Sequence, residues 1–296
     1  MDKVIVIVGP TCSGKTKLSI ELAKKYNGEI INADSTQIYK GNDIATAKVS
    51  TKEMDGIKHY LLSIKELNED YTVFDYQMDA RCFIQKIIDK GKIPILVGGT
   101  GLYIKSVLYE YKFDIEDKPK ENYEQYSNDD LYQKLLSVDP KTNIHPNNRK
   151  RVERALNYYF ANNKPISSKE KNDKMVYDAI IIGLTTDRNL LYQKINERVD
   201  KMLEHGLLDE ANKIYESGIR TKAVLTPIGY KELFPYFEGK DTLDNAILLM
   251  KQNSRHYAKR QYTWFLHQMN VNWFTTNYDN FNNTIEDVIN YIDGVI

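Results

Sequence analysis

Four stretches of the chain are dominated by apolar residues, and each is short enough to be a single buried strand. They cover residues 4–8, 29–33, 93–97 and 176–184. The first and the third are followed by a glycine-rich turn and then by apolar residues at helical spacing. Strand, turn and helix in that order are typical of a parallel sheet with helices on its faces. The pattern therefore predicts an α/β fold built on a parallel sheet flanked by helices.

Two weaker patterns predict further strands, over residues 57–62 and 271–274, the second at an edge of the sheet. Thr72 and Asp75 have the spacing of a capping box, so a helix is expected to begin there. Other helices are predicted from apolar spacing and from the cap residues at their ends. They cover residues 187–205 and 241–265, and the last one starts near Thr284.

The composition changes between residues 111 and 175. Charged residues and Asn become more frequent there, apolar runs are shorter, and helical spacing is the main pattern, most clearly over residues 147–160. After this segment the chain returns to a strand pattern. We therefore expect a core formed by residues 1–111 and 176–296, with residues 112–175 inserted as an all-helical domain.

The overall composition is that of a globular protein, since 42% of the 296 residues are hydrophobic and 28% are charged. The formal net charge is zero, so no overall positive field indicates a polyanionic partner, although local basic patches can still bind one. Cys12 and Cys82 lack the spacing of a zinc site or a disulfide framework, which favours a reducing compartment. No stretch resembles a membrane span or a signal peptide, so a cytoplasmic location is expected.

The turn after the first strand reads Gly-Pro-Thr-Cys-Ser-Gly-Lys-Thr over residues 9–16, which is the G-x-x-x-x-G-K-T pattern of a P-loop. The backbone N–H groups of such a turn, together with the N-terminus of the following helix, attract phosphate oxygens. Lys15 adds a mobile cation, and the Thr16 hydroxyl suits a magnesium ion that is shared with a phosphate. The pattern predicts a phosphorylated ligand but does not identify it.

Most P-loop enzymes that hydrolyse or transfer a phosphoryl group need an acidic residue at the end of a second hydrophobic strand. Here the strand over residues 93–97 ends in Gly98-Gly99-Thr100-Gly101 instead. Asp34 is the nearest carboxylate at a strand end, where it can act as a general base, cap a helix, or support a magnesium ion without binding it directly. The Thr11 hydroxyl can reach the bridging oxygen of a leaving phosphate, or it can simply stabilise the turn.

Two groups of basic residues lie in predicted helices, and Lys251, Arg255 and Lys259 of the second group have i, i+4 spacing. Groups of this kind suit a phosphodiester backbone, although a solvated helix face is the more usual explanation of either group taken alone. His59 and His145 are isolated, and we assign neither a catalytic role. The first basic group is Arg149, Lys150, Arg151 and Arg154, and the second is Lys251, Arg255, Lys259 and Arg260, with His256 and Trp264 nearby.

In their order along the chain, the motifs resemble those of one family, the tRNA dimethylallyltransferases, also called tRNA isopentenyl transferases. Residues 9–16 are similar to the family's GPTASGKT loop, and Asp-Ser-Thr-Gln-Ile-Tyr at residues 34–39 is similar to its DSxQxY segment. The similarity covers nearly the whole chain, and the ordered series is far more specific than a P-loop alone. Further similar segments lie at residues 43–48 (Asp-Ile-Ala-Thr-Ala-Lys), 95–103, 144–147 with Arg151 and Arg154, 228–232 (Ile-Gly-Tyr-Lys-Glu) and 257–265.

The resemblance implies transfer of the dimethylallyl group of dimethylallyl diphosphate to the exocyclic amine of the adenosine 3′ of the anticodon in tRNA, with release of diphosphate. The P-loop then binds diphosphate rather than ATP, which agrees with the missing second acidic motif. Magnesium is the expected cofactor, with Thr16 on the metal. The diphosphate would be held by Gly9, Pro10, Thr11, Cys12, Ser13, Gly14, Lys15 and Thr16.

The resemblance also implies roles for single residues. Asp34 would accept the amine proton, Thr11 would donate a hydrogen bond to the bridging oxygen, and Lys15 would stabilise the leaving charge. The adenine, flipped out of the anticodon stack, would lie against Asp34, Ser35, Thr36, Gln37 and Thr100. The anticodon stem–loop would contact the inserted helical domain through Lys150, Arg151 and Arg154, and the core through Arg255, Lys259 and Arg260.

The sequence departs from the family pattern at a few positions. Cys12 replaces the usual alanine, and residues 122–125 lack the arginine expected at the start of the insertion. No zinc-finger spacing is found near the C-terminus, as in the bacterial form, and we expect a monomer without an obligate protein partner. Two other classes agree with a P-loop: a kinase acting on a nucleotide or small molecule, and an RNA-binding protein gated by a nucleotide.

Overall fold

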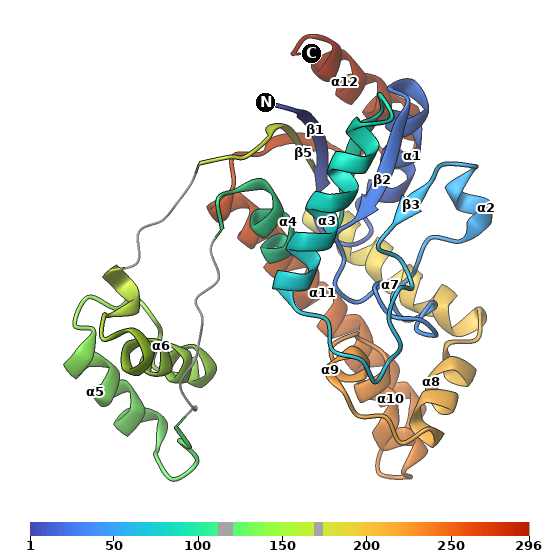
Figure 1. Ribbon diagram of the computed structural model, residues 1–296. Coiled ribbons are helices and arrows are strands. Elements are labelled where there is room, and N and C mark those ends of the chain that lie inside the picture. The colour runs from blue at the N-terminus through green and yellow to red at the C-terminus, as the bar shows by residue number, and fades with distance from the viewer. Residues whose placement is uncertain (112–120, 169–173, 296) are drawn as a thin grey trace. The chain divides into compact units, whose positions relative to one another are not determined.

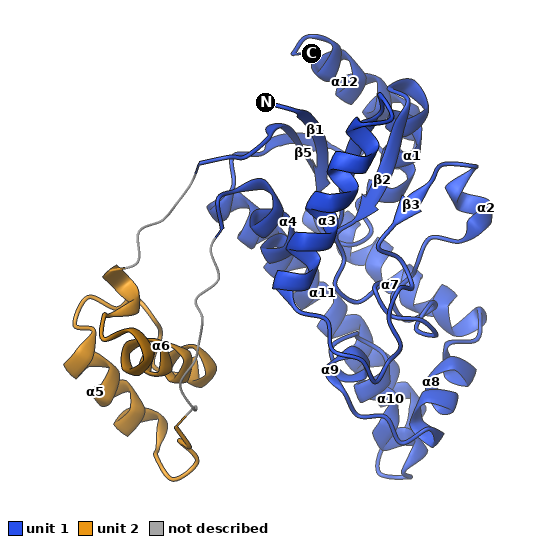
Figure 2. Ribbon diagram, viewed as in Figure 1, with its two compact units in different colours: residues 1–111, 174–296 blue, residues 112–173 orange. Residues whose placement is uncertain are grey.

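The computed structural model describes residues 1–111, 121–168 and 174–295 of the chain. The chain forms two compact units, coloured separately in Figure 2: unit 1 contains residues 1–111 and 174–296, and unit 2 contains residues 112–173. The change in composition along the chain predicts the corresponding boundaries at 111/112 and 175/176. Each unit has a hydrophobic core of its own.

Unit 1 is built on one six-stranded sheet with the strand order β3-β2-β4-β1-β5-β6, in which all neighbouring strands are parallel. The four strongest apolar runs form its middle, β2-β4-β1-β5, and the predicted edge strand is β6. The predicted α/β fold with a parallel sheet is therefore confirmed. The strands are β1 (Lys3–Val8), β2 (Gly28–Asn32), β3 (His59–Tyr60), β4 (Ile93–Val97), β5 (Asp178–Thr185) and β6 (Asn272–Thr275).

Helices connect the strands and continue beyond them. Thr72 and Asp75 form the expected capping box at the start of α3, and Asp187 caps α7. Within the described residues, no helix has the length and apolar character needed to cross a membrane. The helices of unit 1 are α1 (Lys15–Lys25), α2 (Thr51–Met54), α3 (Val73–Ile88), α4 (Gly101–Leu108), α7 (Arg188–Glu204), α8 (Leu207–Glu216), α9 (Lys222–Leu225), α10 (Tyr230–Phe237), α11 (Leu243–Gln268) and α12 (Phe281–Asp293).

Helices cover both faces of the sheet, as Figure 1 shows for α3 and α12. Val4, Val6 and Val8 of β1 pack into a hydrophobic cluster with α3, α4 and the end of α11. Ile5 and Ile7 point to the opposite face, where they pack with α1 and α12. Because both faces are buried, the central strands read as continuous apolar runs and not as an alternation of apolar and polar residues.

Two elements differ from the sequence prediction. β3 contains only His59 and Tyr60 instead of residues 57–62, because Leu61 and Ser63 take positive φ angles of 59° and 51° that end the strand. α12 begins at Phe281, before the predicted start at Thr284. Threonine is a common N-cap residue, but Thr284 is the fourth residue of α12. Its buried hydroxyl accepts a hydrogen bond from the backbone N–H of Asn277.

Helices α7 to α11 form a third hydrophobic cluster, which lies below the sheet in the view of Figure 1. Leu207 and Ala211 of α8 pack there against Tyr230 and Leu233 of α10. The sequence analysis did not predict α9 or α10. Tyr230, Leu233, Phe234 and Phe237 of α10 have helical spacing, but the helix is only eight residues long and contains Pro235, a residue that usually ends a helix.

Unit 2 contains α5 (Asn128–Val138), α6 (Arg149–Asn162) and the short 3-10 helix η1 (Ile166–Ser168). Arg149 donates hydrogen bonds to the backbone carbonyls of Tyr123 and Tyr126, so this member of the first basic group helps to hold the unit together. The other members, Lys150, Arg151 and Arg154, are exposed. The small core of unit 2 consists of Tyr123, Leu131, Leu135, Val152, Ala155 and Leu156.

Glu29 is a buried carboxylate in β2. It accepts hydrogen bonds from the Tyr60 hydroxyl at 2.7 Å and from the ammonium groups of Lys90 and Lys92 at 2.8 and 2.9 Å. Burial raises the pKa of Glu29, but the two ammonium groups and the phenol outweigh burial and lower it to about 2. The carboxylate therefore stabilises the folded chain as long as it is ionised.

We expect Glu29→Gln to lower the free energy of unfolding by about 2 kcal/mol at pH 7, a value reduced by the partial exposure of both lysines. Because the folded-state pKa lies below the unfolded value of 4.5, this contribution is present above pH 4.5 and is lost as the pH falls toward 2. Urea unfolding at pH 7 and pH 3 measures the difference. Glu286→Gln, which changes an exposed carboxylate on α12, should leave stability unchanged at both values. A difference that does not shrink at pH 3 would contradict the assigned cause.

Candidate active site

The P-loop joins β1 to α1 and has the backbone conformation that its glycines allow. Gly9, Cys12 and Gly14 have positive φ angles of 136°, 65° and 90°, so the chain turns sharply between strand and helix. A Cβ atom at Gly9 would lie 2.5 Å from the carbonyl oxygen of Leu184, which excludes any side chain there. Gly14 directly precedes α1, whose first N–H groups have no acceptor within the helix.

The carbonyl groups of the loop are held by the segment between β6 and α12. The Thr276 hydroxyl donates to the carbonyl of Ser13 at 2.9 Å, and the Tyr278 hydroxyl donates to that of Cys12 at 2.8 Å. The Ser13 hydroxyl is buried and has no hydrogen-bond partner among the described residues. Since an unpaired buried hydroxyl is costly, this group fits a site that a ligand completes. The loop therefore suits an anion such as phosphate or diphosphate.

Two cations lie at the loop. The Lys15 ammonium donates to the carbonyl of Pro10 at 2.7 Å. Arg198 of α7 donates from Nη1 to Thr11 Oγ1 at 2.7 Å and to Cys12 Sγ at 3.7 Å. Burial lowers the pKa of Lys15 to about 8, with Arg198 acting in the same direction and Asp34 opposing it. An anion bound in the loop would favour the charged form of Lys15.

Asp34 follows β2 at the carboxyl end of the sheet, where the sequence places it. Its Oδ1 accepts hydrogen bonds from the Thr36 backbone N–H at 3.0 Å and from the Thr36 hydroxyl at 2.6 Å. Its own backbone N–H donates to Asn32 Oδ1 at 3.1 Å. The second carboxylate oxygen, Oδ2, accepts no hydrogen bond from any described residue. One oxygen thus orders the turn, and the other is available to accept a proton.

The glycine turn after β4 packs directly against α11. A Cβ atom at Gly99 would lie 1.9 Å from Gln261 Nε2, and one at Gly101 would lie 2.1 Å from the Trp264 ring. Gln261 donates from Nε2 to the carbonyl of Gly99 at 3.2 Å and accepts at Oε1 from the Thr11 N–H at 2.9 Å. The glycines are therefore needed for this close contact, which links the turn after β4 to the P-loop.

One cavity of about 1210 Å³ joins these elements. It is larger than most sites for a single small molecule. Within it, Thr100 Oγ1 accepts from the Ser35 N–H at 3.0 Å and donates to Ser35 Oγ at 3.2 Å. The predicted site residues that line the cavity are Thr11, Cys12, Ser13, Gly14, Lys15, Thr16, Asp34, Ser35, Thr36, Gln37, Thr100 and Arg260.

The remaining predicted site residues of unit 1 lie outside the cavity lining. Gly9 and Pro10 belong to the P-loop but do not line the cavity. Arg255 donates to Asn196 Oδ1 at 2.8 Å, and Lys259 is exposed on α11. Lys150, Arg151 and Arg154 belong to unit 2.

The residues present fit a magnesium ion that is held largely by its ligand. Among the described residues, no group of three His, Cys, Asp or Glu side chains is arranged to hold a metal. Thr16 is exposed, lines the cavity and lies in the first turn of α1. A hydroxyl there can bind an ion that is already coordinated by phosphate oxygens, which is the usual way that magnesium binds beside a phosphate.

The sequence model of a known family, described as IPP transferase, matches residues 37–268 of this chain. The chain belongs to the IPP transferase family. A tRNA dimethylallyltransferase of Anoxybacillus flavithermus is 48% identical over 301 residues, which cover 99% of this chain and 97% of the relative. A relative with the same name from Bacillus pumilus is 47% identical over 303 residues, which cover 98% of this chain and 95% of the relative.

Solved structures agree with this family. The crystal structure of tRNA delta(2)-isopentenylpyrophosphate transferase from Staphylococcus epidermidis is 44% identical, with a TM-score of 0.77 over 100% of both chains. A eukaryotic dimethylallyltransferase, studied while acting on tRNA, is 32% identical, with a TM-score of 0.84 over 99% of this chain and 80% of that one. These similarities confirm the resemblance that the ordered motifs indicate.

The sequence analysis of this IPP transferase missed Arg198, Gln261 and Tyr257, which all line the cavity. Burial is the main cause that raises the pKa of Tyr257, and the Asp34 charge adds to it. Arg198 is a single polar residue between the inward-facing Ile195 and Val199, a pattern that gives no signal of its own. Gln261 and Tyr257 lie in segment 257–265, which resembles the family. The resemblance alone gave neither side chain a role.

We expect Arg198→Met to weaken the binding of inorganic pyrophosphate about tenfold to thirtyfold, because the variant lacks a charged donor at the P-loop. Isothermal titration calorimetry with magnesium present measures the dissociation constant. Arg188→Met removes an exposed arginine at the start of the same helix and should leave the affinity within about twofold. Equal affinity of Arg198→Met and the unchanged chain would show that Arg198 does not contact the anion.

Proposed function

We propose that this IPP transferase moves the dimethylallyl group of dimethylallyl diphosphate to the exocyclic amine of the adenosine 3′ of the anticodon in tRNA, and releases diphosphate. The observation that carries the proposal is that the P-loop and Asp34 line the same cavity. Relatives named tRNA dimethylallyltransferase support the same reaction. The glycine turn after β4 stands where a phosphoryl-transfer enzyme needs a carboxylate, which disfavours a kinase.

In this reaction the amine nitrogen forms a bond to the first carbon of the dimethylallyl group, and the bond from that carbon to the bridging oxygen breaks. The electron pair stays on the diphosphate, where Lys15, Arg198 and the loop N–H groups stabilise the added charge. Because Thr11 Oγ1 accepts a hydrogen bond from Arg198, its own proton is free to be donated to the bridging oxygen. The proton that leaves the amine goes to Asp34 Oδ2.

Magnesium, when bound, neutralises part of the diphosphate charge. Thr16 would hold it together with diphosphate oxygens. Ser35, Thr36, Gln37 and Thr100 surround Asp34 in the cavity lining and would hold the adenine, which has to leave the anticodon stack to reach them. The basic residues of α11 (Arg255, Lys259, Arg260) and of unit 2 (Lys150, Arg151, Arg154) would contact tRNA phosphates.

The unchanged protein is expected to transfer label from dimethylallyl diphosphate to unmodified tRNA in a magnesium-dependent reaction. Asp34→Asn should lower kcat about a hundredfold or more, because the amide cannot accept the amine proton. Label retained on tRNA after acid precipitation measures the rate. Asp279→Asn, which changes an exposed aspartate outside the cavity lining, should keep the rate of the unchanged protein. Absence of label with the unchanged protein refutes the proposed reaction, and a decrease below about threefold refutes the role of Asp34.

The binding of unit 2 to tRNA can be tested through its salt dependence. Changing Lys150, Arg151 and Arg154 together to Gln should weaken tRNA binding and flatten the plot of log K against log salt by about 0.7 for each phosphate that the variant no longer binds. Changing the exposed Lys141 and Lys164 of the same unit to Gln removes two positive charges elsewhere on the unit, and the loss of affinity for each charge removed should be smaller there. Pyrophosphate affinity should stay the same in both variants. An unchanged salt slope would exclude these three residues as phosphate ligands.

A further inference from the structure

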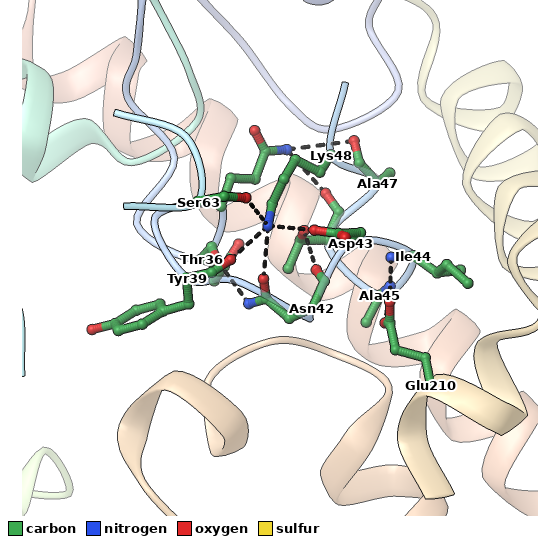
Figure 3. A network of polar contacts seen from close by, with 12 residues as sticks. Thr36, Tyr39, Asn42, Asp43, Ile44, Ala45, Ala47, Lys48, Ser63 and Glu210 are labelled. Atoms are coloured by element: carbon green, nitrogen blue, oxygen red, sulfur yellow. Dashed lines mark hydrogen bonds and ion pairs between the residues drawn. The ribbon is translucent and has the colours of Figure 1, made fainter. Parts of the chain in front are cut away.

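Lys48 is a buried lysine at the centre of a polar network next to the active site (Figure 3). Its side chain is 6% exposed. The ammonium donates to the carbonyl of Tyr39 at 2.5 Å, Asp43 Oδ1 at 2.6 Å, Ser63 Oγ at 2.9 Å and Asn42 Oδ1 at 3.1 Å. A buried ammonium is costly unless its protons are all taken up by acceptors, and here four oxygens surround three protons.

The segment that Lys48 holds has little regular structure of its own. Residues 33–50 form neither helix nor strand, apart from an isolated bridge between Tyr39 and Lys65. Backbone hydrogen bonds to residues 63–65 hold residues 37–40 of this segment, and side-chain contacts add to them over residues 34–48. The segment includes Asp34 and Gln37, two residues that line the cavity.

One chain of hydrogen bonds leads from Lys48 to Asp34. Lys48 donates to Asn42 Oδ1, and the fully buried Asn42 donates from Nδ2 to the carbonyl of Thr36 at 2.8 Å. Thr36 in turn donates its backbone N–H and its hydroxyl to Asp34 Oδ1. Because Asn42 uses both ends of its amide in this chain, its orientation is determined. The Asn32 amide holds the backbone of Asp34, and this chain from Lys48 adds a second support, which reaches the carboxylate through Thr36.

A second set of contacts leads to Gln37. The Gln37 amide nitrogen donates to the carbonyls of Thr46 at 3.0 Å and Ala47 at 3.4 Å, directly before Lys48 in the chain. Gln37 Oε1 accepts no hydrogen bond from any described residue. Because both amide protons are engaged, Oε1 is the polar atom of Gln37 that can bind a ligand. It can accept a hydrogen bond from a donor such as an exocyclic amine.

Glu210 of α8 holds the opposite side of the same segment, as Figure 3 shows. Its two carboxylate oxygens accept from the N–H groups of Ile44 at 2.8 Å and Ala45 at 2.9 Å. The hydroxyl of Tyr230, the first residue of α10, donates to Glu210 Oε1 at 2.7 Å. The segments 43–48 and 228–232, which the sequence analysis marked without a role, are thus joined through Glu210.

We propose that Lys48 is a positioning residue for prenyl transfer, whose ammonium aims the acceptor oxygens of Asp34 and Gln37 at the amine of the substrate adenine, with Glu210 clamping the other side of the segment. This inference rests on the proposed function. Lys48 itself touches neither substrate. Removal of its ammonium lets the segment shift, and a shift of about 1 Å at reacting groups can cost about a hundredfold in rate.

Lys48→Met in the full chain tests the inference. We expect kcat for transfer to tRNA to fall about tenfold to a hundredfold. The dissociation constant of inorganic pyrophosphate should stay within about twofold, because the P-loop is held by Gln261, Thr276 and Tyr278 and not by Lys48. Lys40→Met is the matched control: Lys40 lies in the same segment but forms an exposed ion pair with Glu66, so both constants should match those of the unchanged protein.

Glu210→Gln provides a second variant with the same shape, in which an amide NH₂ replaces one of the two acceptors of the clamp. It should lower kcat about threefold to tenfold and leave pyrophosphate binding unchanged. This variant decides the outcome if Lys48→Met melts below the assay temperature in a circular dichroism scan. Glu210→Gln activity within about twofold of the unchanged protein then overturns the inference.

The possible results separate the two proposals. If the unchanged protein attaches no label to tRNA, the proposed function fails before any variant is compared. If it does, a folded Lys48→Met with kcat within about twofold overturns the positioning role alone. Equal losses of kcat and of pyrophosphate affinity also overturn it, because they indicate a general effect on the fold. A loss confined to kcat supports it.

Discussion

The carboxamide of Gln261 joins the two turns on which the active site depends. Its side chain is buried, accepts from the backbone of Thr11 in the P-loop and donates to the backbone of Gly99 after β4. Since both ends of the amide have hydrogen-bond partners, its orientation is determined and its burial carries little penalty. Gly99 has to lack a side chain because a Cβ atom would occupy the place of the amide. A contact between residues 250 positions apart thus sets one wall of the cavity.

The two halves of the cavity are held by different kinds of support. The side formed by the P-loop and the glycine turn follows directly from the ends of β1 and β4. Hydrogen bonds from Thr276 and Tyr278 hold it as well, so its position is fixed by the parallel sheet. The side that carries Asp34 and Gln37 is an irregular segment. It is held by backbone hydrogen bonds to residues 63–65, by the buried ammonium of Lys48 and by the carboxylate of Glu210. The P-loop side carries cations, and the other side carries the Asp34 carboxylate. This arrangement suits a reaction in which an anion leaves at the P-loop and a proton is taken up by the carboxylate.

Much of this protein could be predicted because the deciding interactions are local. The P-loop needs positive φ angles at Gly9 and Gly14, and the capping box at Thr72 needs only residues three apart, so short patterns were sufficient. The predictions that were wrong concern elements whose ends are set by distant contacts. Thr284 has the residue type of an N-cap but hydrogen-bonds the preceding loop. β3 ends at Tyr60, where Leu61 leaves the extended conformation and its carbonyl accepts a hydrogen bond from the Asn32 side chain.

The sequence by itself determined the parallel sheet, the P-loop turn and, through the ordered motifs, membership of the IPP transferase family. Those features follow from periodicity and from backbone conformations that only certain residues adopt. Only the tertiary structure revealed Arg198 beside Thr11, Gln261 between the two turns and the partners of Lys48. Each of these is a polar side chain on an ordinary helix or loop, and its role comes from which groups the fold brings within hydrogen-bonding distance, a property that no short stretch of sequence encodes.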